Sequence, residues 1–200
     1  MARPRTFDEE GALDAAMRTF WEKGYEATST QDLCDATGLG RSSIYNTFKS
    51  KHDLFERVLA RYIDSMTTAQ LAVLEDTRHS AADRLRTLFA MVVDGETETD
   101  HRTGGRGLGC LTVNTTVELV ARDPRAAEML DRDTRRRLTA LRAVLQEGQR
   151  EGSITSPRDA GALARFVNAA IGGMRISSQG GADRAALESI AEITMDALTG

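Results

Sequence analysis

The twenty residues from Ser29 to Phe48 constrain the fold of this chain more than any other stretch. Ser29 and Asp32 have the spacing of a capping box, which predicts that a helix begins there. The glycines at 38 and 40 allow a tight corner, and a short polar segment follows it. The stretch therefore predicts two short helices, over about 29–38 and 41–48, that meet at a sharp angle.

The composition favours helices along the rest of the chain. The sequence contains three prolines and lacks runs of alternating β-branched residues, so strands are not expected. Hydrophobic residues make up 40% and charged residues 28%, which is typical of a soluble globular protein. Because 200 residues can bury a substantial core, we expect an all-α protein with one or two domains.

Apolar residues at helical spacing, together with local caps, predict about nine helices. Asp123-Pro124 and Ser156-Pro157 each place a capping side chain before a proline at the first helical position. The polar, glycine-rich segment over 95–109 is expected to be a loop. The expected helices cover about 8–23, 29–38, 41–48, 51–77, 82–94, 110–121, 124–150, 157–178 and 183–200.

Residues 1–52 have the features of a helix-turn-helix domain, and the helix over 51–77 links them to a second domain over 53–200. Ile44 and Phe48 lie four residues apart and can anchor the second short helix from one side. A helix-turn-helix places its second helix in the major groove of DNA. The candidate DNA-binding residues are Ser29, Arg41, Ser42, Ser43, Tyr45, Asn46, Lys49 and Lys51.

These side chains suit different parts of a duplex. Arg41 can bind a guanine edge with two hydrogen bonds, and the serines can reach base edges or phosphates. Tyr45, Asn46 and Lys51 suit phosphate contacts, which fix the register without reading sequence. The helix that begins at Ser29 can offer backbone amides to a phosphate.

The net charge of −4 does not exclude DNA binding, because affinity depends on local charge. Between residues 36 and 51 the chain has three basic residues and no acid. Arg3 and Arg5 form a second small basic cluster. The alternative for the whole stretch is an ordinary helical corner with a solvated polar face.

A family resemblance rests on one set of residues, which are Ala15-Ala16, Phe20, Gly24-Tyr25, Ser29, Asp32-Leu33, Gly38-Leu39, Ser43-Ile44-Tyr45, Phe48, Ser50-Lys51 and Leu54. With these residues, the segment 11–55 resembles the DNA-binding domain of the TetR family of bacterial transcriptional regulators. The resemblance implies an all-helical homodimer with an N-terminal operator-binding domain and a C-terminal domain that holds a small ligand. In that family, ligand binding typically releases the operator.

The sequence departs from the family pattern at two positions. Gly40 stands where the family often has serine as a helix cap, so a hydroxyl contact to phosphate is lost. Glycine still caps adequately, at a cost of a few tenths of a kcal/mol relative to serine. Cys34 stands where the family usually has a small buried residue, and core packing is its expected role.

The last two helices are expected to form the dimer contact, as the resemblance implies. Small residues are frequent over 161–173, and they allow another helix to approach closely. Packing within one chain is the alternative for some of the apolar residues there. Two recognition helices on a twofold axis would read half-sites roughly 34–36 Å or more apart, so the expected partner is a palindromic operator.

The resemblance places the effector pocket between the DNA-binding domain and the dimer helices. Apolar walls with a few polar groups suit a small, mostly hydrophobic compound, although core packing is an equally good explanation for each residue. The candidate ligand-binding residues are Met66, Phe89, Val93, Cys110, Asn114, Val117 and Glu118, with Val92 and Val113 beside them.

Cys110 supports a more specific hypothesis, that the thiol senses oxidants or electrophiles. It is expected at a helix N-terminus, where free backbone amides favour a thiolate. The alternative is a buried, unreactive thiol. With only two cysteines, Cys34 and Cys110, a disulfide framework is not expected, and a reducing compartment is the simple inference.

An enzyme is the rival class of function, and a regulator that needs no ligand is a third. His52, His79 and His101 lack metal-ligand spacing, and no motif for a nucleophile or a phosphate loop is present. We expect no catalytic site, no cofactor and no metal. The sequence has no signal-peptide pattern and no apolar run of the ~20 residues that a membrane span needs, so a cytoplasmic protein is expected.

Overall fold

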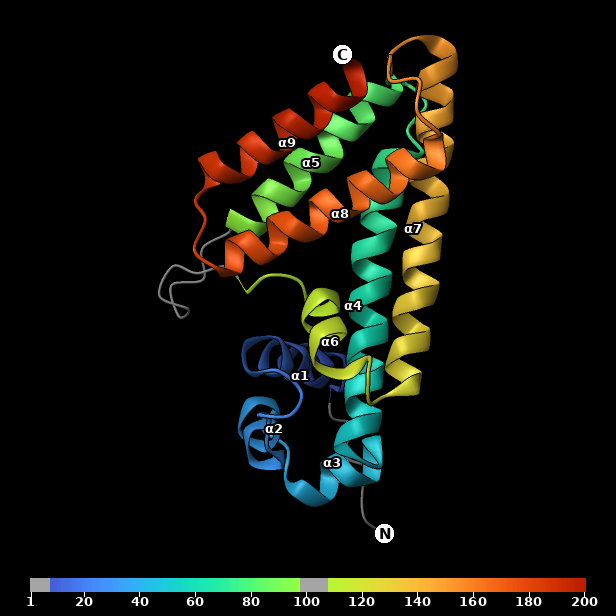
Figure 1. Ribbon diagram of the computed structural model, residues 1–200. Helices are drawn as coiled ribbons and strands as arrows, with labels where there is room; N and C mark the ends of the chain where they lie inside the picture. The colour runs from blue at the N-terminus through green and yellow to red at the C-terminus, as the bar shows by residue number, and fades with distance from the viewer. Residues whose placement is uncertain (1–7, 98–107) are drawn as a thin grey trace.

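The computed structural model describes residues 8–97 and 108–200, which form nine α-helices and no strands (Figure 1). The helices are α1 (Glu9–Lys23), α2 (Thr30–Thr37), α3 (Arg41–Phe48), α4 (Lys51–Leu74), α5 (Ala81–Thr97), α6 (Leu111–Leu119), α7 (Pro124–Glu151), α8 (Ala160–Gln179) and α9 (Arg184–Thr199). The prediction of an all-α fold is confirmed. Arg3, Arg5, His101 and most of the loop expected over 95–109 lie outside the described residues.

The predicted helix boundaries agree with the structure to within about three residues, and the start of α8 is one of the larger differences. Its N-cap is Asp159, whose carboxylate accepts a hydrogen bond from the backbone N–H of Ala162 at 2.8 Å. The prediction that a helix begins at Ser156-Pro157 was wrong. The carbonyl of Ser156, which would accept the first hydrogen bond of such a helix, instead accepts one from the Gln149 side-chain amide at 2.8 Å, and the Ser156 N–H donates to the carbonyl of Leu198 at 3.0 Å.

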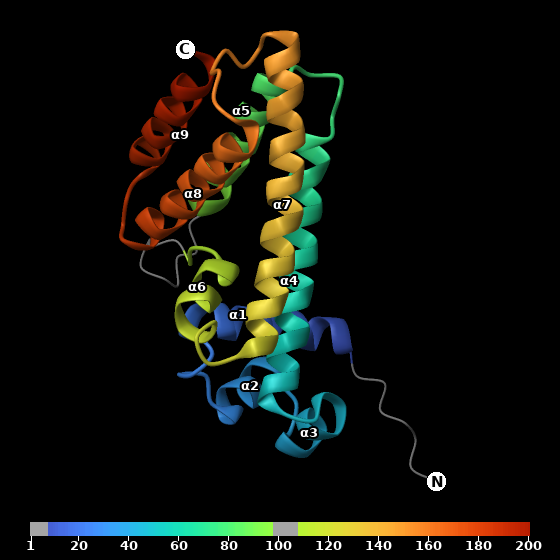
Figure 2. The same ribbon diagram turned by 45° about the vertical axis from the view of Figure 1, so that its right-hand side comes forward.

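The first three helices pack against the N-terminal half of α4 (Figures 1 and 2). Phe20, Leu33, Phe48 and Phe55 are fully buried in this small core. The rings of Phe20 and Phe55 meet edge to face, with their centroids 5.1 Å apart. This packing fixes α1, α2 and α3 as one unit on the end of α4.

The second core lies among α4, α5, α7, α8 and α9. Figures 1 and 2 show α4 and α7 running side by side, with α5, α8 and α9 stacked against one half of them. Leu85, Leu145, Val167 and Leu187 are fully buried there. Because α4 is one helix of 24 residues, it spans roughly 36 Å and joins both cores without a break.

The short helix α6 lies between the two cores (Figure 1). Its buried residues Leu111 and Leu119 belong to the core of the first unit, whereas the helix itself leads into α7. No helix within residues 8–97 and 108–200 combines the length and the apolar character that crossing a membrane requires.

Candidate nucleic-acid interface and effector cavity

The corner between α2 and α3 has the geometry that the sequence predicts. The Ser29 hydroxyl accepts a hydrogen bond from the backbone N–H of Asp32 at 3.1 Å, and the Asp32 carboxylate accepts one from the backbone N–H of Ser29 at 2.8 Å. Gly38 ends α2 with φ 68°, in the left-handed region that favours glycine. Gly40 is the N-cap of α3 and makes no side-chain cap. The capping box and the glycine turn together set the angle between the two helices.

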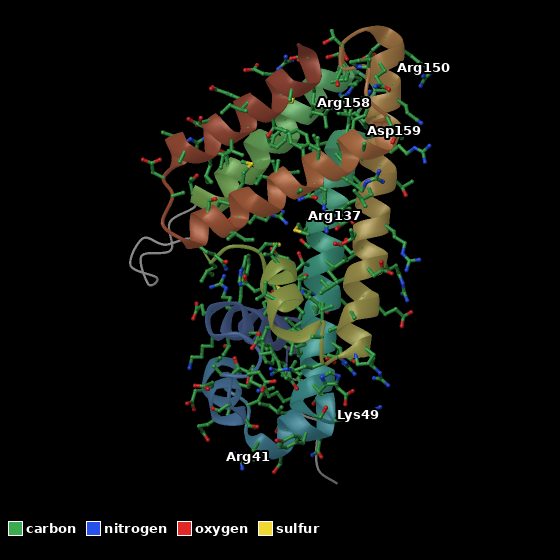
Figure 3. The ribbon with its side chains drawn as sticks, viewed as in Figure 1. Arg41, Lys49, Arg137, Arg150, Arg158 and Asp159 are labelled. Carbon is green, nitrogen blue, oxygen red and sulfur yellow. The ribbon has the colours of Figure 1, made fainter. Side chains whose placement is uncertain are left out.

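Buried apolar side chains hold α3 on one face only. Ile44 and Phe48 are 1% and 0% exposed and pack in the core around Leu33. The opposite face of α3 points into solvent at the end of the molecule that carries Arg41 and Lys49 (Figure 3). The predicted DNA-binding residues that are exposed on and beside this helix are Arg41, Ser42, Ser43, Tyr45, Asn46 and Lys49.

Three contacts orient the polar groups around this face. The Tyr45 hydroxyl lies 3.2 Å from the Thr30 hydroxyl, so the phenol is held beside the N-terminus of α2. The Lys51 ammonium lies 4.4 Å from the centroid of the Tyr25 ring and donates to the Glu26 carbonyl at 3.5 Å. Thr30 was missed in the sequence analysis, although its place directly after the Ser29 cap is a signal that could have indicated it.

Lys49 has an unusual backbone conformation, with φ 61° and ψ −49°. Within the described residues it is the only residue other than glycine with a positive φ. Its backbone N–H caps α3 by donating to the Tyr45 carbonyl at 3.0 Å. Strained backbone of this kind is concentrated at functional positions, and here it carries a basic side chain at the end of α3.

Two side chains tie α6 to the unit formed by α1, α2 and α3, which is the candidate DNA-binding unit. The Glu118 carboxylate accepts hydrogen bonds from the backbone N–H groups of Tyr25 and Glu26 at 2.9 and 2.8 Å. At the other end of α6, the Trp21 indole N–H donates to the Gly109 carbonyl at 3.1 Å. The turn after α1 and the body of α1 are therefore both attached to the segment that forms α6.

A cavity of about 280 Å³ lies beside these contacts. Its walls come from α1, α4, α5 and α8 and from Gly109, directly before α6. Because this volume lies near the lower limit of ~300–1,000 Å³ that is usual for small-molecule sites, only a small compound fits. The side chains that matter most for its chemistry are Trp21, Tyr62, Met66, Met91, Glu96 and Arg175.

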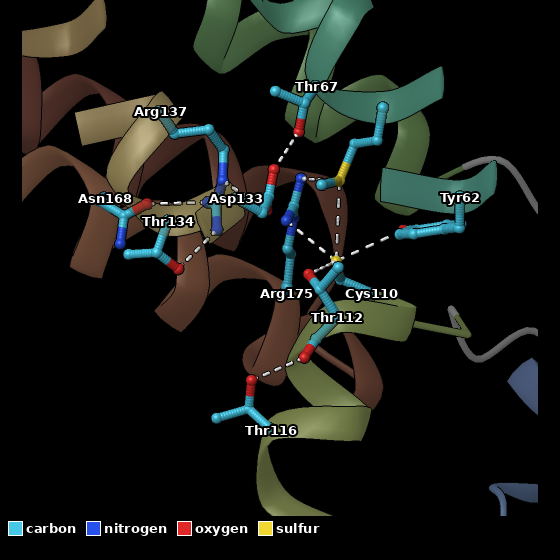
Figure 4. Close-up of polar contacts among 11 residues, drawn as sticks. Tyr62, Thr67, Cys110, Thr112, Thr116, Asp133, Thr134, Arg137, Asn168 and Arg175 are labelled. Atoms are coloured by element: carbon cyan, nitrogen blue, oxygen red, sulfur yellow. Dashed lines mark hydrogen bonds and ion pairs between the residues drawn. The ribbon is translucent and has the colours of Figure 1, made fainter. Parts of the chain in front are cut away.

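Cys110 lies behind the cavity wall and is 1% exposed. Its Sγ accepts hydrogen bonds from Arg175 Nη1 at 3.0 Å and from the Tyr62 hydroxyl at 3.4 Å (Figure 4). Burial, and then the neighbouring Cys110, raise the pKa of Tyr62, so the phenol keeps its proton and donates. As predicted, Cys110 is the residue before the first turn of α6.

The structure separates the seven predicted ligand-binding residues. Met66 lines the cavity and Cys110 adjoins it, whereas Phe89 and Val93 are buried in the second core. The Asn114 amide donates to the Leu108 carbonyl at 3.3 Å and accepts from Gln179 at 2.6 Å. The remaining two point elsewhere, with Val117 83% exposed and Glu118 bound to backbone.

Of the six cavity side chains named above, only Met66 was predicted from the sequence, and Trp21, Tyr62, Met91, Glu96 and Arg175 were missed. The signal for Arg175 was its position, because it is the only charged residue between Arg165 and Asp183. Within residues 8–97 and 108–200, no group of three or more histidine, cysteine or carboxylate side chains is placed to hold a metal ion.

Comparisons with known proteins match both halves of the chain. The family described as "Bacterial regulatory proteins, tetR family" matches residues 12–58, and "Tetracyclin repressor-like, C-terminal domain" matches residues 81–194. The chain is 35% identical to the HTH-type transcriptional repressor ComR of Escherichia coli over 193 residues, which are 96% of this chain and 90% of ComR.

Solved structures are similar over almost the whole length. A cysteine mutant of the TetR family transcriptional regulator CifR, complexed with a 26-bp double-strand operator DNA, superposes with a TM-score of 0.84 and 25% identity. That match covers 98% of this chain and 100% of the CifR chain. The reduced form of NemR from Escherichia coli shares the fold, with a TM-score of 0.82 and 17% identity over 94% of this chain and 95% of NemR.

Proposed function

The chain belongs to the TetR family of bacterial regulatory proteins, and we propose how its own residues bind the operator and release it. It is a DNA-binding transcriptional regulator and not an enzyme. We propose that it acts as a repressor in the cytoplasm, with a DNA-binding domain over 1–52 and a ligand-binding and dimerisation domain over 53–200. The helix α4 is shared between the two.

The proposal for DNA binding rests on the exposed polar face of α3. Arg41, Ser42 and Ser43 are at its N-terminal end, where a recognition helix contacts base edges. Tyr45 and Asn46 follow and suit phosphate contacts. The phosphate set is completed by Lys49, Lys51 and the backbone amides at Ser29.

The homodimer forms through α8 and α9, as the exposed apolar side chains of these helices indicate. Phe166 is 45% exposed, Ile176 56% and Ile193 66%. A Cβ added at Gly172 or Gly173 would have no atom of another described element within 4 Å, so a partner helix has room to approach there. The twofold axis then sets two α3 helices against a palindromic operator.

Release of the operator is proposed to begin in the cavity beside α6. Trp21 of α1 is both a wall of the cavity and a hydrogen-bond donor to Gly109. A molecule that enters therefore touches the DNA-binding unit and the second core together. Because Glu118 also holds the turn after α1, a movement of α6 carries the DNA-binding unit with it.

A binding experiment tests this function. Full-length protein is titrated onto a fluorescent inverted-repeat oligonucleotide from the DNA next to its coding sequence, at several salt concentrations. We expect affinity that falls steeply with salt, binding as a dimer, and loss of affinity in Arg41→Ala. Absence of salt-sensitive affinity for every inverted repeat tested, or a monomer in solution, contradicts the proposal.

Modification of Cys110 is a second route to release, and one contact favours it. The Arg175 guanidinium donates a hydrogen bond to the sulfur at 3.0 Å, so a change at the sulfur alters this contact between α8 and the residue before α6. In Cys110→Ser we expect that an oxidant or electrophile no longer releases the operator. If the variant responds as the unaltered protein does, the thiol is not the sensor.

A further inference from the structure

Arg175 is a buried cation whose hydrogen bonds go to sulfur. Its side chain is 7% exposed, Nη1 donates to Cys110 Sγ at 3.0 Å and Nη2 to Met66 Sδ at 3.3 Å (Figure 4). Its Nε lies 3.8 Å from Glu96 Oε1, beyond hydrogen-bond distance. Sulfur is a weak acceptor, so among the described residues this guanidinium has an ion pair at 3.8 Å but no oxygen at hydrogen-bond distance, which a buried charge normally has.

Glu96, which lines the same cavity as Arg175, is also incompletely hydrogen-bonded. Its side chain is 8% exposed, and within the described part of the chain its Oε2 is buried without a hydrogen-bond partner. Burial raises the pKa of this carboxyl, and the charge of Arg175 offsets the rise only in part. An unsatisfied buried oxygen beside an under-satisfied guanidinium calls for an explanation, and a missing ligand supplies one.

The rest of the cavity wall is mostly apolar, with Tyr62, Ser65 and Gln70 as its uncharged polar side chains, and among the described residues that line it Arg175 is the one cation. Trp21, Met66, Met91 and Val92 provide the hydrophobic surface, and all of them line the same space of about 280 Å³ as Arg175 and Glu96. A ligand that fits has one polar end for the two charged residues and a small apolar body. The guanidinium fork matches a carboxylate, to which it donates two parallel hydrogen bonds.

We propose that this cavity binds a small monocarboxylic acid with an apolar body, held through its carboxylate by Arg175. The proposal rests on the proposed function, because the acid is the effector that releases the operator. Arg175 turns its donors from the two sulfurs to the ligand oxygens. Glu96 holds a proton when the acid is bound, and its hydroxyl donates to a ligand oxygen, which removes the repulsion between two carboxylates.

Calorimetry on the full-length protein without DNA tests the proposal. Hexanoate, benzoate and phenylacetate are the probes, and hexanamide, benzamide and phenylacetamide are matched neutral compounds of nearly the same shape. We expect at least one acid to bind and its amide to bind more weakly. If no acid binds, or if each amide binds as well as its acid, the proposed ligand class is wrong.

Two variants with opposite expected effects on acid binding distinguish a loss of ligand recognition from misfolding of the protein. Arg175→Met keeps an unbranched apolar stem and removes the guanidinium, and we expect it to weaken acid binding on the order of 30-fold or more. Glu96→Gln removes the competing carboxylate and keeps a donor, so we expect tighter binding, which a misfolded variant cannot show. Arg184→Met, at an exposed arginine paired with Asp94 and Glu188, is the control and should bind the acid normally.

Operator binding is measured on the same samples. Unchanged acid affinity in Arg175→Met overturns the proposal, whatever the operator does. If the operator binds and no acid does, only the ligand class fails. If an acid binds as predicted and the operator does not respond, the assignment of this cavity to operator release fails instead.

Discussion

Replacement of Glu118 by alanine should loosen the DNA-binding unit from the rest of the protein. The Glu118 carboxylate accepts two backbone hydrogen bonds, from Tyr25 at 2.9 Å and Glu26 at 2.8 Å. It also fills the space above Gly24, where an added Cβ would lie 3.1 Å from Oε2. No other side chain among the described residues binds these two amides.

The magnitude follows from the exposure of the two amides. A hydrogen bond to a charged group contributes about 1.5–3 kcal/mol when it is protected from water. The Tyr25 bond is partly buried and the Glu26 bond is exposed, so water replaces most of the second. We therefore expect Glu118→Ala to lower the free energy of unfolding by about 2 kcal/mol. Glu118→Gln keeps one acceptor oxygen and should lose about half as much.

Two measurements on the dimer at one fixed protein concentration check this prediction, because the stability of a dimer depends on concentration. Urea denaturation gives the free energy, and hydrogen exchange reports the Tyr25 and Glu26 amides directly. Glu75→Ala, at an exposed glutamate directly after α4, is the control and should change neither. Unaltered exchange at both amides in Glu118→Ala would refute the argument that this carboxylate ties α6 to the turn after α1.

Three further predictions concern other parts of the molecule. Arg41→Ala should reduce operator affinity most for sequences with guanine at one position, which binding to a panel of operator variants measures, and equal loss on all of them would reassign Arg41 to phosphate. Ile193→Asp places a charge on the exposed apolar part of α9 and should yield monomers in analytical ultracentrifugation, whereas a persistent dimer would exclude that surface. Asp32→Asn should destabilise the DNA-binding unit at neutral pH, because hydrogen bonds from Lys23 and then Ser29 hold the pKa of Asp32 well below its usual range. Because the pKa of Asp32 is lower in the folded protein than the ~3.9 of the unfolded chain, its charge stabilises the folded state above that pH, and this stabilisation is lost as the pH falls. The melting temperatures of the unaltered protein and of Asp32→Asn should therefore converge in acid. A difference in melting temperature that stays constant with pH would contradict this.

The DNA-binding unit was predictable because its signals are local. Ser29 and Asp32 are three residues apart, and the corner at Gly38 needs only its own backbone conformation. The alternation of buried Ile44 and Phe48 with polar neighbours shows which face of α3 is free. Each of these signals lies within one or two helical turns, where sequence spacing and spatial proximity agree.

The cavity was less predictable because distant segments build it. Trp21, Glu96 and Arg175 come from α1, α5 and α8, and no local rule brings them together. Glu118 was expected at a ligand, yet it binds the backbone at Tyr25, far away in the sequence. The spacing of residues along α6 predicts which of them share a face, but it does not predict which other helix packs against that face.

The position of Cys110 links the proposed ligand to the DNA-binding unit. A ligand shifts an equilibrium only by its difference in affinity between two states. An acid that takes the donors of Arg175 removes the contact to Cys110, which precedes the first turn of α6, while Glu118 still holds the other end. The bound state therefore favours a tilt of α6, and the turn after α1 moves with Glu118. Reciprocity then requires that bound operator lowers the affinity for the acid by the same factor, so Glu118→Ala should reduce both effects together.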